Sequence, residues 1–303
     1  MTRRTEALPW IALVAVYFLW GSTYLGIRVA VATIPPFLMT GSRYALAGVL
    51  LFALQWFFAK KKPALPNRAQ LLRIAVIGIL LLAVGNGLLC VAETRVESGT
   101  AALLIASSPI FMVVVDAIRA RKAPSALAVA GIVLGSIGIA FLVGRSSLHT
   151  DLLMAGLILF SSFAWSVGSV YARDTPHHAL TAPLEMTIGG GVSILAGLAF
   201  GETSRLHVGA ITSESLWGML WLVFGGAIVG YSAFAYTVRR LPTATVATYG
   251  YVNPVVAVIL GAIVLGEPVT WRILAGGAAV VGSVALILLG SRRTATALDA
   301  PAS

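Results

Sequence analysis

The chain has 303 residues, of which 58% are hydrophobic and only 11% are charged, with a formal net charge of +10. A soluble domain carries roughly 25% charged residues, so this composition excludes an ordinary soluble enzyme or binding domain. Because the apolar residues gather in runs of roughly 20, the length of a membrane-crossing helix, the sequence predicts an all-α polytopic membrane protein.

Ten apolar runs follow one another along the chain, and each predicts a transmembrane helix. Membrane-spanning strands are excluded, because they are about half as long and alternate polar and apolar residues. The first run also differs from a cleavable signal peptide, since it is too long and contains Trp20 and Arg28. The predicted helices cover residues 9–31, 36–58, 71–92, 98–118, 125–143, 152–172, 183–200, 215–237, 243–265 and 270–290.

Lysine and arginine gather in every second connection between these runs. Cytoplasmic loops of membrane proteins are enriched in both residues, so we expect the N- and C-termini to be cytoplasmic. The positive charge is then explained by topology and by contact with anionic lipid headgroups, not by a nucleic-acid surface. The basic segments are Arg3–Arg4, Lys60–Lys62 with Arg68 and Arg73, Arg119–Lys122, Arg173, Arg239–Arg240 and Arg292–Arg293.

Cysteine, histidine and motif content argue against a metal site, a cofactor and catalysis. Cys90 is the single cysteine, so no intrachain disulfide is possible, and the four histidines show no paired ligand spacing. The sequence contains neither the phosphate-binding motif GxxxxGK[ST] nor the GxSxG motif of serine hydrolases. We therefore expect no cofactor, no metal ion, no ATP-driven step and no enzyme activity.

A short phrase occurs twice, half a chain apart. FLWGSTYL at 18–25 and FAWSVGSV at 163–170 each hold a tryptophan two residues after a phenylalanine, and an arginine follows eight residues later. Along the same offset of 145 positions, Gly85 matches Gly230 and Pro109 matches Pro254. The near-constant offset indicates an internal duplication.

Each half contains five predicted helices, an odd number, so the second half must enter the membrane from the opposite side. The sequence therefore predicts two inverted five-helix repeats, residues 1–146 and 147–291, followed by a cytoplasmic tail at 292–303. Inverted repeats are typical of secondary transporters, whose substrate site lies near the membrane midplane between the halves. Since one chain supplies both halves, we expect a monomer.

Five stretches resemble the EamA-type branch of the drug/metabolite transporter superfamily: FLWGSTY, GSRYALAGVLL, LLIASSPIFMVVV, FAWSVGSVYAR and residues 251–283. The resemblance covers nearly the whole chain and is strongest to bacterial amino-acid and aromatic-amino-acid exporters. It implies export or facilitated passage of small metabolites across a bacterial inner membrane. The family often has an acid in both halves, whereas this chain has Glu267 in the second half and Lys122 in the first. We interpret Glu267 as structural, beside the positive end of the helix at 270–290.

Two tryptophans are the leading candidates for the substrate site. Trp20 and Trp165 lie about twelve residues into their helices, near the membrane centre, whereas the other tryptophans lie near helix ends. An indole in a central cavity can stack on an aromatic side chain or hold an ammonium group. The alternative is simple packing between helices. Tyr24 and Ser169 follow the two tryptophans by four residues, on the same helix faces.

Further polar residues are expected to face protein or water because unpaired polar groups are costly in hydrocarbon. Asn86 and its counterpart Tyr231 are candidates for substrate contact or for bonds between helices. Ser108, Tyr249 and Asn253 precede Pro109 or Pro254, each of which leaves a carbonyl four residues upstream without its amide donor. These prolines are candidate hinges, with a plain helix kink as the alternative.

Arg43 lies deep in the second predicted helix, where it either attracts a substrate carboxylate or serves as a structural residue of the family. The predicted helix at 9–31 holds no acid, and we expect Glu93 and Asp116 to be interfacial, so facilitated diffusion or weakly coupled export is favoured. The predicted function is transport of amino acids or similar metabolites by alternating access through a central cavity. The alternatives are export of cationic drugs or other metabolites, or a membrane-embedded lipid enzyme.

Overall fold

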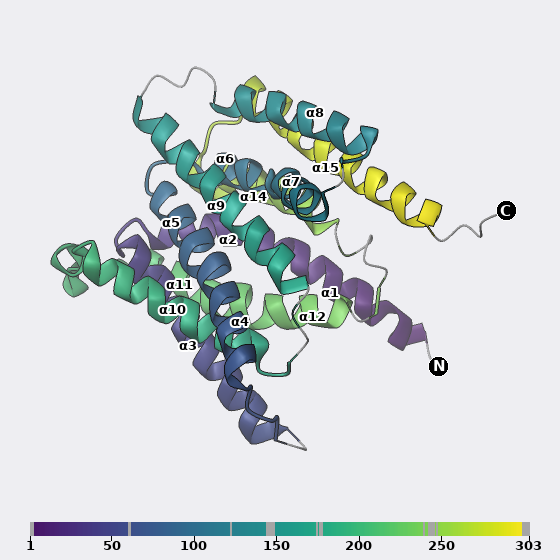
Figure 1. Cartoon of the computed structure of the whole chain (residues 1–303). Coiled ribbons are helices and arrows are strands. Elements are labelled where there is room, and N and C mark those ends of the chain that lie inside the picture. Colours follow the sequence, from purple (N-terminus) through teal and green to yellow (C-terminus); the bar gives the residue numbers. More distant parts are fainter. Residues whose placement is uncertain are drawn as a thin grey trace.

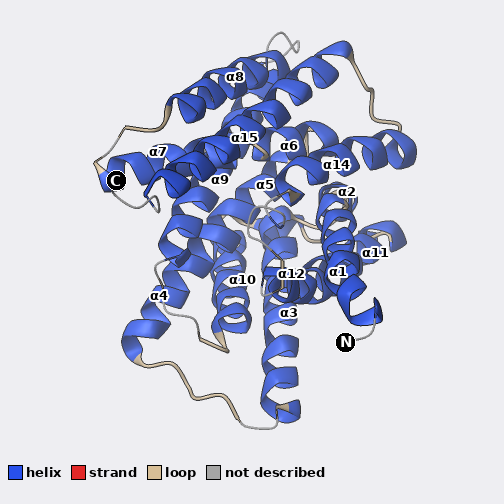
Figure 2. Ribbon diagram, turned by 90° about the vertical axis from the view of Figure 1, so that its right-hand side faces the viewer, coloured by secondary structure: helices blue, strands red, loops and turns tan. Residues whose placement is uncertain are grey.

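The computed structural model describes residues 3–59, 62–121, 123–143, 149–173, 175, 178–238, 240–241, 246 and 248–298. Every regular element in these ranges is helical (Figures 1 and 2), as the composition predicts. The elements are α1 (Arg3–Gly21), α2 (Thr23–Ala30), α3 (Pro36–Phe58), α4 (Arg68–Gly78), η1 (Ile79–Asn86), α5 (Gly87–Ala92), α6 (Ser98–Ile105), α7 (Ser108–Ala120), α8 (Ala126–Val143), α9 (His149–Arg173), α10 (Thr181–Ala199), η2 (Glu202–Arg205), η3 (Val208–Ala210), α11 (Ser213–Trp221), η4 (Leu222–Gly230), α12 (Tyr231–Val238), α14 (Tyr249–Leu265) and α15 (Trp271–Leu298).

Seven helical stretches are long and apolar enough to cross a membrane, and three more are apolar but shorter. The seven are Ala7–Ala30, Pro36–Phe58, Arg68–Ala92, Ser98–Ala120, Leu152–Arg173, Thr181–Ala199 and Ser213–Phe234, and the three are Ala126–Leu142, Val252–Leu265 and Trp271–Ile287. Each of the ten predicted runs overlaps one of these stretches. The prediction of an all-helical, multi-pass membrane protein is thus confirmed.

The helix ends follow local sequence signals. Pro36 opens α3 at the first helical position, where its missing amide hydrogen costs nothing. The helix predicted from residue 71 instead begins at Arg68, because Asn67 and Gln70 form a capping box. Asn67 Oδ1 accepts from the Gln70 amide and Gln70 Oε1 accepts from the Asn67 amide, both over 2.9 Å.

Several predicted spans are interrupted, which the hydropathy pattern did not indicate. Residues 106–107 separate α6 from α7 just before Pro109, and Ser22 separates α1 from α2. Two spans contain π-helical segments, η1 and η4, in which the hydrogen bonds skip one residue more than in an α-helix. The two π segments nearly coincide when one is shifted by the offset of 145 positions.

Two close helix pairs join the halves of the chain. Figures 1 and 2 show α8 beside α15, and α3 packs along α10 in the same intimate way. Glycines make both contacts possible: a Cβ at Gly138 would lie 2.8 Å from the Gly276 carbonyl oxygen, and one at Gly190 would lie 2.8 Å from that of Gly41. Glycines at 131–138 and 276–282 thus allow α8 and α15 to approach closely.

The remaining contacts also link the two halves. Helix α9 packs against η1 and α7, while α1 packs against α12 and α14, and α6 packs against α14. The sixth predicted helix (152–172) thus contacts the third and fourth (71–92 and 98–118). In the same way, the first (9–31) contacts the eighth and ninth (215–237 and 243–265). Each half thus inserts its first helix against the equivalent helices of the other half.

Candidate functional site

Trp20 on α1 is half-buried against the second half of the chain. Its Nε1 donates to the Gly226 carbonyl oxygen over 3.2 Å. Its ring centroid lies 4.8 Å from that of Phe234 on α12 and 5.3 Å from that of Tyr249 on α14. A Cβ at Gly230 would lie 2.8 Å from Trp20 Nε1, so only glycine leaves room for the indole. Two predicted site residues, Trp20 and Tyr249, therefore share one aromatic cluster.

Trp165 on α9 is half-buried against elements of both halves. Together with Tyr231, it packs on a buried cluster that includes Tyr44 of α3 and Ala227 of η4. A Cβ at Gly85 would lie 3.4 Å from Trp165 Cε3, so the indole also lies against the first half. Trp165 and Tyr231 are the second pair of predicted site residues that the fold brings together.

The two indole contacts are equivalent under the sequence repeat. Trp20 lies against Gly230 and Trp165 lies against Gly85, and the members of each matching pair stand 145 positions apart. Both glycines belong to the π segments, whose irregular backbone is often found at functional sites. Within the described aromatic pairs, the two indole rings do not touch each other.

Tyr24 and Ser169 were predicted to lie on the same helix faces as Trp20 and Trp165, and the structure places the two residues in different settings. Tyr24 lies on α2, beyond the turn at Ser22 that separates it from Trp20, and packs against the buried cluster around Ile27. Ser169 lies one turn after Trp165 on the uninterrupted helix α9 and is half-buried.

Ser108 opens α7 and lies in a small serine cluster. Its Oγ donates to the Ile105 carbonyl oxygen over 2.6 Å and lies 2.8 Å from Ser162 Oγ on α9. The Ile105 carbonyl, which Pro109 leaves without an amide donor, is therefore already bonded within the protein. This matches the alternative in which the proline only kinks the helix and a neighbouring group bonds to the carbonyl oxygen left without its amide donor.

Two predicted amides bond to nearby main chain. Asn86 is the last residue of η1, and its Nδ2 donates over 3.3 Å to the carbonyl oxygen of Leu81, five residues earlier. Asn253 is buried, and in the amide orientation that satisfies its neighbours its nitrogen donates to the carbonyl oxygens of Tyr249 at 3.1 Å and Tyr17 at 3.3 Å. Both amides thus stabilise irregular stretches next to the aromatic side chains.

Arg43 on α3 is only 4% exposed. Its Nη2 donates to Tyr44 Oη over 2.9 Å, and its guanidinium carbon lies 4.3 Å from the centre of the Tyr44 ring. Its Nε and Nη1 are buried and have no hydrogen-bond partner in the described part of the chain. The guanidinium therefore keeps two nitrogens whose hydrogens have no acceptor among the described groups.

Glu93, predicted to be interfacial, is fully buried, so that prediction is wrong. It follows α5 directly, and Arg28 Nη1 donates to its main-chain oxygen. Its two carboxyl oxygens have no partner among the described groups. Burial raises the pKa of Glu93 well above its usual range; nearby Glu267 adds to the shift, while Arg28 and Arg43 oppose it.

Buried acids are present that the sequence analysis did not predict. Glu93, Glu185 and Glu202 are all buried. Glu185 lies inside the predicted run 183–200, so its position in the sequence already indicates a buried acid. Asp116, by contrast, pairs at a partly exposed position with Arg173, at 2.5 and 3.1 Å, as an interfacial residue would.

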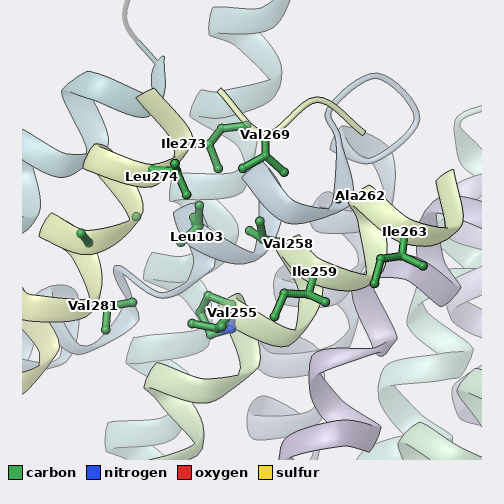
Figure 3. A pocket seen from close by; sticks show the side chains of 13 residues that line it. Leu103, Val255, Val258, Ile259, Ala262, Ile263, Val269, Ile273, Leu274 and Val281 are labelled. Carbon is green, nitrogen blue, oxygen red and sulfur yellow. The ribbon is translucent and has the colours of Figure 1, made fainter. Parts of the chain in front are cut away.

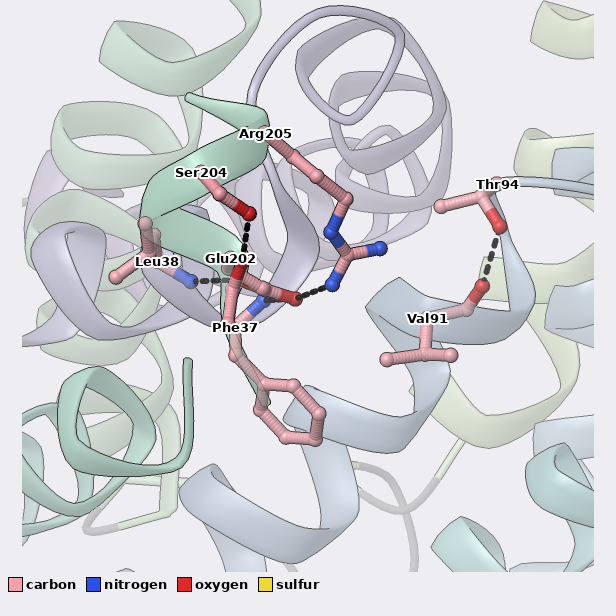
Figure 4. A network of polar contacts seen from close by, with 8 residues as sticks. Phe37, Leu38, Val91, Thr94, Glu202, Ser204 and Arg205 are labelled. Carbon is pink, nitrogen blue, oxygen red and sulfur yellow. Dashed lines mark hydrogen bonds and ion pairs between the residues drawn. The ribbon is translucent and has the colours of Figure 1, made fainter. Parts of the chain in front are cut away.

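Two other acids, the buried Glu202 and the half-buried Glu267, cap helices across the boundary between the halves. Glu202 accepts from the amides of Phe37 at 3.2 Å and Leu38 at 2.9 Å, at the start of α3 (Figure 4). Glu267 accepts from the amides of Ser98 at 2.8 Å and Gly99 at 3.1 Å, at the start of α6. The expected partner of Glu267 was the helix that follows it, and the contacts show that the acid caps α6 of the first half instead.

A groove of about 510 Å³ lies between α14 and α15, with Leu103 of α6 at its floor (Figure 3). All of its lining side chains are apolar, and several are well exposed, with Ile263 at 76%. Of the predicted site residues it includes only Pro254, which lies inside α14. The groove is therefore distinct from the polar central cavity predicted from the sequence.

The long apolar helices and the packing between them define a multi-pass helical membrane protein. The model of the EamA-like transporter family matches this chain twice, at residues 8–144 and 152–289. The chain therefore belongs to the EamA-like transporter family, as the sequence motifs predicted, and is a membrane transporter rather than an enzyme.

Relatives of known name span most of the chain. The "Uncharacterized inner membrane transporter YedA" of Escherichia coli strain K12 is 38% identical over 291 residues, which cover 92% of this chain and 90% of the relative. The "Probable amino-acid metabolite efflux pump" of Salmonella typhimurium strain LT2 is 26% identical over 303 residues, covering 93% and 95%. One crystal structure matches with a TM-score of 0.64 at 18% identity, covers 97% of this chain and 99% of that chain, and shows the fold alone.

Proposed function

We propose that the protein moves amino acids or similar small metabolites across a bacterial inner membrane, by export or facilitated diffusion. The relative named as an amino-acid metabolite efflux pump supports this substrate class. The relative named as an inner membrane transporter supports the location. The distribution of lysine and arginine supports cytoplasmic termini.

In this proposal the pathway lies between two inverted five-helix repeats, residues 1–146 and 147–291, and one chain is the working unit. The reciprocal indole contacts carry the proposal: Trp20 lies against Gly230 and Trp165 against Gly85. The double match of the family model supports the same division. Because each half contacts an indole of the other half, a rocking motion between the halves would change both indole–glycine contacts at the same time.

The proposed binding chemistry comes from Trp165 and Tyr231, which pack on the cluster that includes Tyr44, and from Arg43, which bonds to Tyr44. The indole and the Tyr231 ring offer apolar faces for a substrate side chain or its ammonium group. Nε and Nη1 of Arg43, which have no partner in the described part of the chain, are the proposed donors to a substrate carboxylate. The proposed lining residues are those predicted from the sequence: Trp20, Tyr24, Asn86, Ser108, Trp165, Ser169, Tyr231, Tyr249 and Asn253.

The two prolines provide the proposed hinges. Pro109 follows the break between α6 and α7, and Pro254 lies inside α14. A proline removes one main-chain hydrogen bond and so lowers the cost of bending at that point. Bending at both positions would let the two halves open at one end of the pathway and close at the other.

Counterflow exchange tests the proposal. Liposomes that hold the purified protein and an unlabelled amino acid should accumulate the labelled form, tested across a panel of amino acids. Trp165→Ala should reduce this exchange by up to about tenfold, because it removes a ring contact of about 0.5–1.5 kcal/mol. Trp217→Ala is the matched control, since that indole is 71% exposed. Normal exchange in folded Trp165→Ala, or equal loss in both variants, would refute the assigned site.

A further inference from the structure

Three glutamates at helix ends differ in their partners. Glu202 caps α3 and Glu267 caps α6, so each accepts two amide hydrogens. Glu93 is as deeply buried as Glu202, whereas Glu267 is half-buried. Glu93 caps nothing, and both of its carboxyl oxygens are unpartnered in the described part of the protein. The same residue type therefore occurs in two distinct chemical settings.

Charged or titratable groups act on Glu93 from α2, α3 and the loop before α15. From α2, Arg28 donates to the main-chain oxygen, and the Tyr24 side chain is close enough to interact with the carboxyl group. Arg43 interacts electrostatically from α3, and Glu267 does so from the loop before α15. Cys90 lies on the same helix, one turn earlier, and is also buried.

The charged neighbours do not complete an ion pair with Glu93 in this conformation. No ion pair of its carboxyl group with Arg28 or Arg43 occurs within the described residues, and Arg43 keeps two unpartnered nitrogens of its own. A buried carboxylate without donors is strongly destabilised, whereas a neutral carboxyl group is tolerated. The burial of Glu93, which raises its pKa, therefore favours the protonated form in the conformation described.

We propose that Glu93 binds and releases a proton during the transport cycle, and that its ionised form pairs with Arg43. The proton comes from water when the α5–α6 connection opens, forms the O–H bond of the carboxyl group, and returns to water when that bond breaks. On release, the negative charge of the carboxylate is balanced by the Arg43 guanidinium. The structure described is the protonated member of this pair of states.

Proton binding then controls the availability of Arg43. Resting on the proposed function, in which Arg43 attracts a substrate carboxylate, the protonated state leaves the guanidinium free and the ionised state occupies it. Substrate affinity should therefore be constant at low pH and weaken by up to about tenfold per pH unit above the pKa of Glu93. Facilitated transport of this kind depends on pH even without a pH gradient.

A measurement without substrate tests the proton site directly. Infrared spectra of the purified protein at neutral pH should contain the carbonyl stretch of protonated carboxyl groups, to which the buried Glu185 can also contribute. Glu93→Gln should remove one component of that band. Glu202→Gln is the control, because its carboxylate already accepts two amides, and it should leave the band in place. A band that persists unchanged in folded Glu93→Gln overturns the proposal.

Counterflow at equal pH on both sides provides the functional arm, with whichever labelled amino acid the wild-type protein exchanges. Glu93→Gln should keep the low-pH affinity at every pH, while Glu202→Gln should keep the wild-type pH dependence. A wild-type pH profile in Glu93→Gln overturns the proposal. If no amino acid exchanges at all, the proposed function fails, and the infrared result still decides whether Glu93 holds a proton.

Discussion

The contact between α3 and α10 permits a stability prediction from two neighbouring glycines. A Cβ added at Gly190 would lie 2.5 Å from the Ala45 amide nitrogen and 2.8 Å from the Gly41 carbonyl oxygen. Ordinary contacts are about 3.4 Å or longer, and main-chain atoms cannot rotate away, so Gly190→Ala must push the helices apart. A Cβ at Gly191 meets nothing within 4 Å.

The expected difference between the two alanine variants follows from this geometry. Both substitutions gain helix propensity of about 0.5–1 kcal/mol relative to glycine, and this gain cancels in the comparison. Overpacking then leaves Gly190→Ala less stable than Gly191→Ala by about 1–3 kcal/mol. Reversible unfolding in mixed detergent micelles, followed by tryptophan fluorescence, measures the difference. Equal stability of the two variants would refute the close approach of α3 and α10.

The remaining predictions concern individual acids and one glycine. Glu202→Ala removes two charge-assisted bonds at the start of α3 and should lower the unfolding free energy by about 1.5–3 kcal/mol per bond in the same assay. Asp116→Asn should cost less than about 1 kcal/mol, because its ion pair with Arg173 is partly exposed. The raised pKa of Glu93 means that the folded protein binds this proton more tightly than the unfolded chain. Protonation of Glu93 therefore contributes fully to the free energy of unfolding below the ordinary glutamate pKa of about 4.3, and this contribution is lost as pH rises through the pKa in the folded protein. Glu93→Gln should make the thermal unfolding temperature less dependent on pH over this range. Gly230→Ala should displace the Trp20 indole and be seen as a shifted fluorescence maximum, whereas an unchanged spectrum would contradict the contact.

Much of the fold could be predicted because hydrocarbon imposes a strict rule on the chain. A spanning helix must be about 20 apolar residues long, and the sequence displays that length ten times. The π segments could not be predicted from hydropathy, since they are as apolar as their surroundings. Only the local signals of Pro109 and the Asn67 capping box point to a break or an end.

Site residues that occur in both sequence repeats could be predicted. Those whose role depends on contacts between distant segments of the chain could not. The offset of 145 positions located Trp20 and Trp165, and the structure places each against a glycine of the other half. The same offset could not reveal that Glu93 is buried without a partner, because burial of an acid at a helix end depends on which loops cover it. Nor could it show that Glu267 reaches across to α6, since such a cap joins segments far apart in the chain.

Labelling of two matched loop positions tests the inverted repeat most directly. Ala64 and Gly209 are exposed loop residues that stand 145 positions apart, in the connections before α4 and α11. In a Cys90→Ser background, Ala64→Cys should react with a membrane-impermeant maleimide only after cells are permeabilised, whereas Gly209→Cys should react in intact cells. Labelling of both cysteines from the same side of the membrane would contradict the account.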